Sequence, residues 1–102
     1  MSKIKKVADF VIAGGGIIGL GMARALACKY PDSKISILEK ERTLGEHTSG
    51  RNSGVLHAGF YYQTDSVKAR FCRQGCQEWT DFCLEHGIGI KQCGKLVTAR
   101  NE

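Results

Sequence analysis

Residues 9–20 of the chain read DFVIAGGGIIGL, and this stretch decides the fold class. An apolar, strand-like run leads into Gly14-Gly15-Gly16, and Gly19 follows three positions later. The Gly-x-Gly-x-x-Gly spacing is typical of the turn that joins the first strand and helix of a dinucleotide-binding unit. In such a unit the first glycine permits a tight turn, the second lets the backbone approach a pyrophosphate, and the third lets the helix pack closely on the strand. The same pattern also occurs in glycine-rich turns that bind nothing.

The residues around this turn predict a β-α-β unit. We expect a strand over 7–13, a helix over 16–29 that Pro31 prevents from continuing, and a second strand over 34–38. Glu39 ends the second strand, twenty residues after Gly19. A carboxylate at that position accepts hydrogen bonds from the hydroxyls of an adenosine ribose, and it would repel a 2′-phosphate. Glu39 therefore favours a ribose-binding unit over a glycine turn without a ligand.

A polar stretch over 41–62, ERTLGEHTSGRNSGVLHAGFYY, is the other informative segment. It combines hydroxyl, amide and glycine residues with a terminal aromatic cluster. Ser49, Asn52, Ser53 and the nearby backbone amides are suited to a pyrophosphate or a ribityl chain. Composition alone gives equal weight to an ordinary surface loop.

The C-terminal part of the chain predicts a long helix over 66–86, capped by Thr64 or Asp65 and ended by Gly87. Two short strands should follow, over 88–92 and 95–99. Trp79 is expected in the core. Three cysteines at i, i+4 and i+11 are interpreted as small buried hydrophobes rather than metal or redox ligands. The apolar face of the helix comprises Val67, Phe71, Cys72, Cys76, Trp79, Phe82 and Cys83.

Composition limits the class of protein. The chain has 102 residues, of which 42% are hydrophobic and 25% charged, as in one small globular domain. The net charge of +5 is spread along the sequence without a basic block interleaved with aromatics, which argues against nucleic-acid binding. Five cysteines, an odd number, and no recognisable signal peptide favour a reducing compartment. We expect a cytoplasmic protein, with a basic leader (Lys3, Lys5, Lys6) suited to peripheral contact at the inner membrane.

Several segments together resemble a known family. VADFVIAGGGIIGLGMARALA, KISILEKE and especially HTSGRNSGVLHAGFYY resemble the N-terminal part of L-2-hydroxyglutarate dehydrogenases/oxidases. These are FAD-dependent oxidoreductases of the D-amino-acid-oxidase and glycerol-3-phosphate-dehydrogenase type. The similarity continues through SVKARFC, FCLEHGI and CGKLVTA. The segment from Arg51 to Gly59, followed by Tyr61-Tyr62, is far more particular than the glycine pattern.

The resemblance implies an α/β fold, with residues 1–102 forming the N-terminal portion of a Rossmann-like FAD-binding domain with an incomplete sheet. It implies FAD. Non-covalent binding is the default expectation, with His47 and His57 as possible points of covalent attachment, and no metal is expected. His57 is the candidate catalytic base, or else it orients the flavin, and Tyr61 and Tyr62 would face the substrate. The residues implied to hold FAD are Gly14, Gly16, Ile17, Ile18, Gly19, Glu39, Lys40, Thr48, Ser49, Arg51, Asn52, Ser53 and Val55.

The implied reaction is the oxidation of L-2-hydroxyglutarate to 2-oxoglutarate, with hydride passing to the flavin and electrons leaving for a quinone or oxygen. Glycerol 3-phosphate or an amino acid would be the substrate in related enzymes, and a nucleotide-binding module without catalysis is the alternative from a different class. Family members are several times longer. We therefore expect the substrate domain to be absent from this chain and residues 1–102 to be inactive alone.

Overall fold

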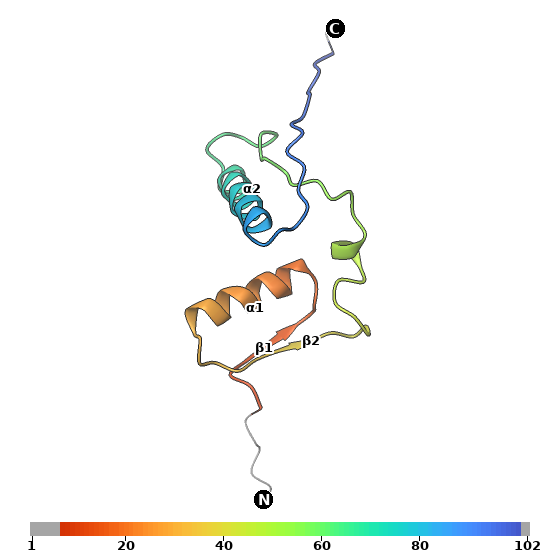
Figure 1. The fold of residues 1–102 in the computed structure, drawn as a ribbon. Coiled ribbons are helices and arrows are strands. Elements are labelled where there is room, and N and C mark those ends of the chain that lie inside the picture. Colours follow the sequence, from red (N-terminus) through yellow and green to blue (C-terminus); the bar gives the residue numbers. More distant parts are fainter. Residues whose placement is uncertain (1–6, 101–102) are drawn as a thin grey trace, which may run out of the picture. The chain divides into compact units, whose positions relative to one another are not determined.

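The computed structural model describes residues 7–100, whose elements are shown in Figure 1. The predicted basic leader lies outside the described residues. The chain divides into two compact units, Met1–Gly54 and Val55–Glu102. The elements in order are strand β1 (Phe10–Ala13), helix α1 (Ile17–Lys29), strand β2 (Ile35–Leu38), a 3-10 turn η1 (Thr48–Gly50) and helix α2 (Val67–Glu85).

The first unit is a β-α-β unit, which confirms the α/β expectation. β1 and β2 pair in parallel, with Phe10 opposite Ile35 and Ala13 opposite Leu38. Helix α1 connects them and packs against both strands (Figure 1). The first strand starts later than predicted, at Phe10 rather than residue 7. The Asp9 carboxylate accepts the N–H of Lys34 at 2.8 Å, so the side chain of Asp9 closes this end of the sheet.

Helix α1 is bounded by residues that cannot extend it. Gly16 is its N-cap, with an extended backbone (φ −82°, ψ −176°) and no side chain to cap the first turn. At the other end the N–H of Tyr30 donates to the carbonyl of Leu26 at 2.8 Å, and Pro31 follows. The ring of Tyr30 stacks on Phe10 with 5.5 Å between ring centroids, which ties the end of the helix to the start of β1.

The second unit is built on α2. Ser66 caps this helix, because its extended backbone (φ −70°, ψ 146°) lets the side-chain oxygen accept the N–H of Ala69 at 3.1 Å. The prediction of Thr64 or Asp65 as the cap is therefore wrong by one or two positions. Gly87 adopts a φ of +65°, and the N–H of Ile88 donates to the carbonyl of Cys83 at 2.8 Å. The predicted glycine ending of the helix is confirmed.

The Ser66 cap gives a stability prediction. We expect Ser66→Ala to lower the free energy of unfolding by about 0.5–2 kcal/mol, because the N–H of Ala69 loses its acceptor. Thr64→Ala is the matched control, since the side chain of Thr64 has no hydrogen bond to a described residue. Urea unfolding followed by circular dichroism measures both variants. Equal destabilisation by the two substitutions would contradict the assignment of the cap.

The apolar face predicted for α2 is not a closed core. Ala69 is the one fully buried hydrophobic residue in the described part of the chain, whereas Phe71 is 60% exposed and Trp79 is 39% exposed. The prediction that Trp79 is core is thus wrong. Within this unit the helix packs on the loop before it, where a Cβ at Gly59 would lie 2.8 Å from Cys72 Cβ. Cys72, Cys76 and Cys83 are half-buried, and the five cysteines are free thiols.

The two short strands predicted after α2 do not form. Residues 88–100 have no regular secondary structure. A strand requires a neighbour for its N–H and C=O groups, and within residues 7–100 no segment pairs with these residues. The sheet consists of β1 and β2 in the described part of the chain, so the expectation of an incomplete sheet is confirmed.

Candidate functional site

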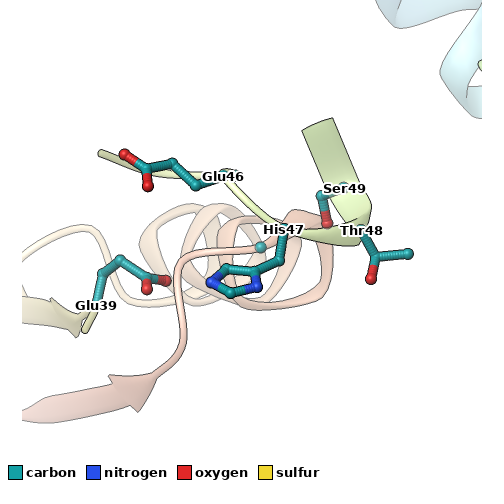
Figure 2. A pocket seen from close by; sticks show the side chains of 7 residues that line it. Glu39, Glu46, His47, Thr48 and Ser49 are labelled. Atoms are coloured by element: carbon teal, nitrogen blue, oxygen red, sulfur yellow. The ribbon is translucent and has the colours of Figure 1, made fainter. Parts of the chain in front are cut away.

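The site lies where the two parallel strands end. Because β1 and β2 run in the same direction, the glycine turn after Ala13 and Glu39 after Leu38 meet at one edge of the sheet. Ligands of open α/β folds bind at this carboxyl edge. A cavity of about 180 Å³ is lined by Gly16, Glu39, Gly45, Glu46, His47, Thr48 and Ser49 (Figure 2). A more open cavity of about 540 Å³ is lined by Ala13, Gly14, Leu38, Glu39, Lys40 and His47.

The glycine turn fits a diphosphate. Gly14 has a φ of +108°, which L side chains rarely adopt, and a Cβ at Gly19 would lie 2.0 Å from the carbonyl oxygen of Gly14. Among the described residues, the N–H groups of Gly16, Ile18 and Gly19 have no hydrogen-bond partner. The N–H of Ile17 donates to Ser49 Oγ at 2.9 Å. Unpaired N–H groups at the positive end of a helix dipole form an anion-binding site.

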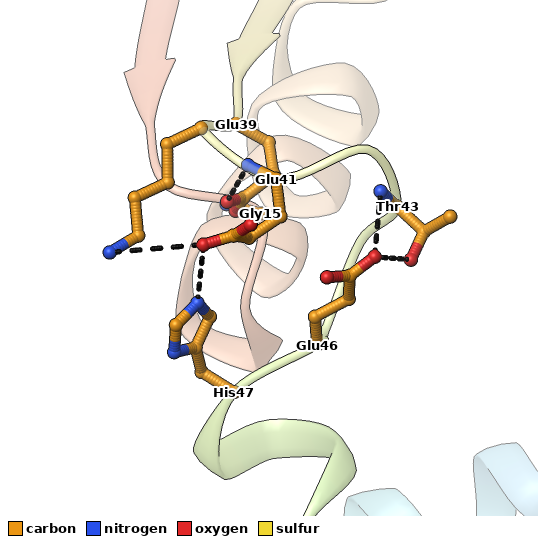
Figure 3. Close-up of polar contacts among 7 residues, drawn as sticks. Gly15, Glu39, Glu41, Thr43, Glu46 and His47 are labelled. Carbon is orange, nitrogen blue, oxygen red and sulfur yellow. Dashed lines mark hydrogen bonds and ion pairs between the residues drawn. The ribbon is translucent and has the colours of Figure 1, made fainter.

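Glu39 occupies the position that its spacing predicts, and backbone groups orient its carboxylate (Figure 3). Oε2 accepts the N–H of Gly15 at 2.7 Å, and Oε1 accepts the N–H of Glu41 at 3.0 Å. A carboxylate can accept about four hydrogen bonds, so both oxygens retain capacity for ligand hydroxyls. The N–H of Glu41, then that of Gly15, hold the pKa of the Glu39 carboxyl below its ordinary value of 4.5, against an opposing effect of desolvation. Glu39 is thus anionic at neutral pH.

This lowered pKa predicts how stability depends on pH. Since the folded-state pKa lies below the unfolded value of 4.5, the ionised carboxylate contributes its full stabilisation above that value. The contribution is lost as the pH falls below 4.5 through the lower folded pKa. We expect the melting temperature of Glu39→Gln to depend less on pH in this window than that of the parent. Thermal melts over an acid pH series test this, with Glu85→Gln in α2 as the control. Parallel profiles for parent and Glu39→Gln would contradict the prediction.

The loop after Glu39 supplies the other wall of the site. Ser49 lies in η1, and a Cβ at Gly16 would lie 3.0 Å from its Oγ, so this turn sits directly over the start of α1. The N–H of Gly45 donates to the carbonyl of Gly15 at 3.0 Å, which anchors the loop on the glycine turn. Oε1 of Glu46 accepts hydrogen bonds from both the backbone N–H and the hydroxyl of Thr43 (Figure 3). The loop is therefore fixed at several points.

Part of this wall was not predicted to bind the cofactor non-covalently. Gly45, Glu46 and His47 line the smaller cavity, and His47 lines both. His47 Nε2 lies 2.9 Å from Glu41 Oε1, and Lys40 Nζ lies 4.0 Å from the same oxygen (Figure 3). The sequence offered one indication that His47 belongs to the site, because His47 directly precedes Thr48 in the polar stretch.

The remaining predicted residues of the first unit lie beyond the cavities. Arg51 and Ser53 are exposed and line neither. Asn52 Nδ2 donates to the carbonyls of Thr48 and Ser49 at 2.9 and 3.0 Å, and its Oδ1 accepts the N–H of Gly54. In the described structure Asn52 therefore holds η1 together. The structure brings together Gly14, Gly16, Glu39, Lys40, Thr48 and Ser49 around the cavities, with Ile17, Ile18 and Gly19 in the adjoining first turn of α1.

Residues predicted for the reacting end of the cofactor lie in the second unit. Val55 and His57 are exposed in an irregular segment, and His57 has no hydrogen bond to a described residue. The rings of Tyr61 and Phe60 lie 4.3 Å apart between centroids, with their planes tilted by 32°. Lys68 Nζ lies 4.3 Å from the centroid of Tyr62. The roles of these residues toward a flavin or a substrate stay predictions.

Within residues 7–100, no group of three or more His, Cys, Asp or Glu side chains is arranged to hold a metal ion. Neither α1 nor α2 has both the length and the apolar character that a membrane crossing needs.

Comparison with known proteins assigns the family. A family model described as FAD dependent oxidoreductase matches residues 9–102. The chain is 50% identical over 91 residues to the mitochondrial L-2-hydroxyglutarate dehydrogenase of Homo sapiens, covering 89% of this chain and 20% of that protein. It is 48% identical over 94 residues to the L-2-hydroxyglutarate dehydrogenase of Escherichia coli K12, covering 92% of this chain and 22% of that protein. The chain spans about a fifth of the length of the curated relatives it matches. It belongs to the FAD dependent oxidoreductase family.

Proposed function

We propose that residues 9–54 bind the ADP half of FAD, and that the protein oxidises the 2-hydroxy acid L-2-hydroxyglutarate to 2-oxoglutarate. One observation carries the first part. The Glu39 carboxylate is held by the N–H of Gly15 at the edge of two cavities, beside the unpaired N–H groups at the start of α1. This juxtaposes an acceptor for ribose hydroxyls with donors for a diphosphate.

Backbone groups and side chains then have distinct roles in cofactor binding. The N–H groups of Gly16, Ile18 and Gly19 donate to phosphate oxygens, and the absence of side chains at Gly14 and Gly16 keeps the approach open. The Glu39 carboxylate accepts from the ribose and disfavours a 2′-phosphate. Thr48, Ser49, Arg51, Asn52, Ser53 and Val55 continue along the cofactor toward the flavin.

The substrate is proposed from the relatives, which are named L-2-hydroxyglutarate dehydrogenases. FAD, when bound, supplies a hydride acceptor for the α-carbon. The chain supplies the base: His57 takes the hydroxyl proton as the C–H bond breaks and the carbonyl forms. An exposed imidazole without a partner among the described residues is suited to this transfer. Tyr61 and Tyr62 then contact the substrate, and electrons leave for a quinone or oxygen. We propose a cytoplasmic site of action with peripheral contact at the inner membrane.

Titration with FAD of a version extended with the native downstream sequence, to the length of the relatives, tests the proposal, with flavin fluorescence as the readout of binding. Anaerobic addition of L-2-hydroxyglutarate, glycerol 3-phosphate and amino acids then identifies the substrate by bleaching of the flavin absorbance. We expect bleaching by L-2-hydroxyglutarate. Failure to bind FAD would refute the proposed cofactor site, and bleaching by another compound alone would refute the proposed substrate.

His57→Asn tests the base separately. We expect this variant to bind FAD like the parent and to be reduced more slowly by substrate. His86→Asn, at the end of α2, is the control for a general effect of losing a histidine. An unchanged reduction rate in His57→Asn would exclude His57 as the base.

A further inference from the structure

The imidazole of His47 is at the centre of the site, although neither the glycine pattern nor Glu39 assigns it a role. It lines both cavities, and Glu39 is the other residue that does so. Figure 2 shows the ring of His47 and the carboxylate of Glu39 pointing toward one another. A group that contacts the Glu39 carboxylate through these cavities would therefore also meet the ring of His47.

Glu41 fixes the orientation of this ring. Its Oε1 lies 2.9 Å from His47 Nε2, and the Glu41 side chain is 35% exposed whereas that of His47 is 61% exposed. A carboxylate only accepts hydrogen bonds, so this contact requires the hydrogen on Nε2. In the neutral ring Nδ1 is then an acceptor. An exposed pair of this kind contributes little to stability, which suggests that its value lies in orienting the ring.

We propose that His47, held by Glu41, binds the adenosine ribose of the dinucleotide together with Glu39. The inference rests on the proposed binding of FAD by residues 9–54. The ribose presents two hydroxyl donors. Glu39 has free acceptor capacity beyond the N–H groups of Gly15 and Glu41, and Nδ1 of the His47 ring, which lines the same two cavities, adds a second acceptor. Glu41 acts as a positioning residue, because its carboxylate sets which nitrogen of the ring is the acceptor.

The neighbouring charges agree with this assignment. Lys40 Nζ lies 4.0 Å from Glu41 Oε1 and so partly balances the carboxylate that holds the ring. The Glu46 carboxylate is engaged by Thr43 instead. The groups around His47 are thus the carboxylates of Glu39 and Glu41 and the ammonium of Lys40. This is an acceptor-rich wall suited to hydroxyl donors rather than to phosphates.

The experiment is a double-mutant cycle in which both residue 47 of the protein and the ribose hydroxyls of the ligand are varied. Isothermal titration gives the dissociation constants of ADP and 2′,3′-dideoxy-ADP for the parent and for His47→Phe, which keeps the ring area but lacks both nitrogens. We expect His47→Phe to weaken ADP binding about 3- to 10-fold and to leave dideoxy-ADP binding nearly unchanged. Glu41→Gln retains an oxygen acceptor for Nε2–H and should lose less affinity than Glu41→Ala. His86→Phe, in the other unit, is the matched control.

The outcomes separate the two proposals. Parent protein that binds neither ADP nor FAD would overturn the proposed function and this inference together. Parent protein that binds ADP while His47→Phe binds it equally well would overturn the inference alone. An equal loss for ADP and dideoxy-ADP would also overturn it, since a general disturbance of the loop does not depend on the ribose hydroxyls. His47→Asn, a smaller change, repeats the cycle if the phenylalanine variant does not fold.

Discussion

Gly19→Ala is expected to destabilise the β-α-β unit by about 1–3 kcal/mol and to weaken FAD binding with it. The added Cβ would lie 2.0 Å from the carbonyl oxygen of Gly14, a backbone atom that cannot turn aside as a side chain can. Either α1 must move away from β1 or the glycine turn must change its path. Both movements displace the N–H groups proposed to hold the diphosphate. Because small domains are marginally stable, this loss is a large share of the total.

Gly21→Ala in the same helix is the matched control. A Cβ at Gly21 meets nothing within 4 Å, so alanine there should stabilise the helix by up to about 1 kcal/mol. Urea unfolding gives the free energy of unfolding for both variants, and flavin fluorescence gives the affinity for FAD. The same substitution is thus expected to lower the free energy of unfolding at position 19 and to raise it at position 21. If both alanines stabilised the protein, the tight packing of α1 against the glycine turn would be refuted.

Glu39→Ala is expected to raise the dissociation constant for FAD about 10- to 100-fold. The proposed hydrogen bonds from ribose hydroxyls to a charged acceptor are among the stronger ones, at about 1.5–3 kcal/mol each. The substitution also removes the acceptor that orients the N–H groups of Gly15 and Glu41. Isothermal titration with FAD and ADP should show similar losses for both ligands, since both contain the adenosine ribose.

Glu85→Gln is the control for Glu39. Glu85 is the last residue of α2 and lines neither cavity, so it tests for a general effect of losing a carboxylate. The affinity for FAD should therefore stay close to that of the parent. A Glu39→Ala variant that binds ADP as tightly as the parent would show that Glu39 does not bind the nucleotide.

The sequence predicts the first unit well because the decisive features there are local. Gly14 and Gly19 are required by one turn and one close approach, and Glu39 follows from the length of a single β-α-β unit. The residues proposed to hold the diphosphate could therefore be placed by spacing alone. His47 could not, because its role depends on a contact with Glu41 and on the way the loop folds back over α1.

The second unit was predicted less well because its features depend on distant partners. The helix α2 and its glycine ending follow from periodicity and from Gly87, and both are confirmed. The segments 88–92 and 95–99 have the composition of strands, but composition supplies no neighbour for their backbone groups. Likewise, the apolar stripe that includes Trp79 predicts a covered face without identifying what covers it.

The open edges of the two-stranded sheet bear on how this chain behaves in concentrated solution. Within the described residues β1 and β2 each pair with the other alone, so each has a row of backbone groups without a neighbouring strand. Val11 and Leu38 are each 61% exposed on these strands. Unpaired apolar edges are templates for strand addition from another molecule, which is the first step of aggregation. The geometry that brings the glycine turn and Glu39 to one edge thus also makes the isolated chain prone to self-association.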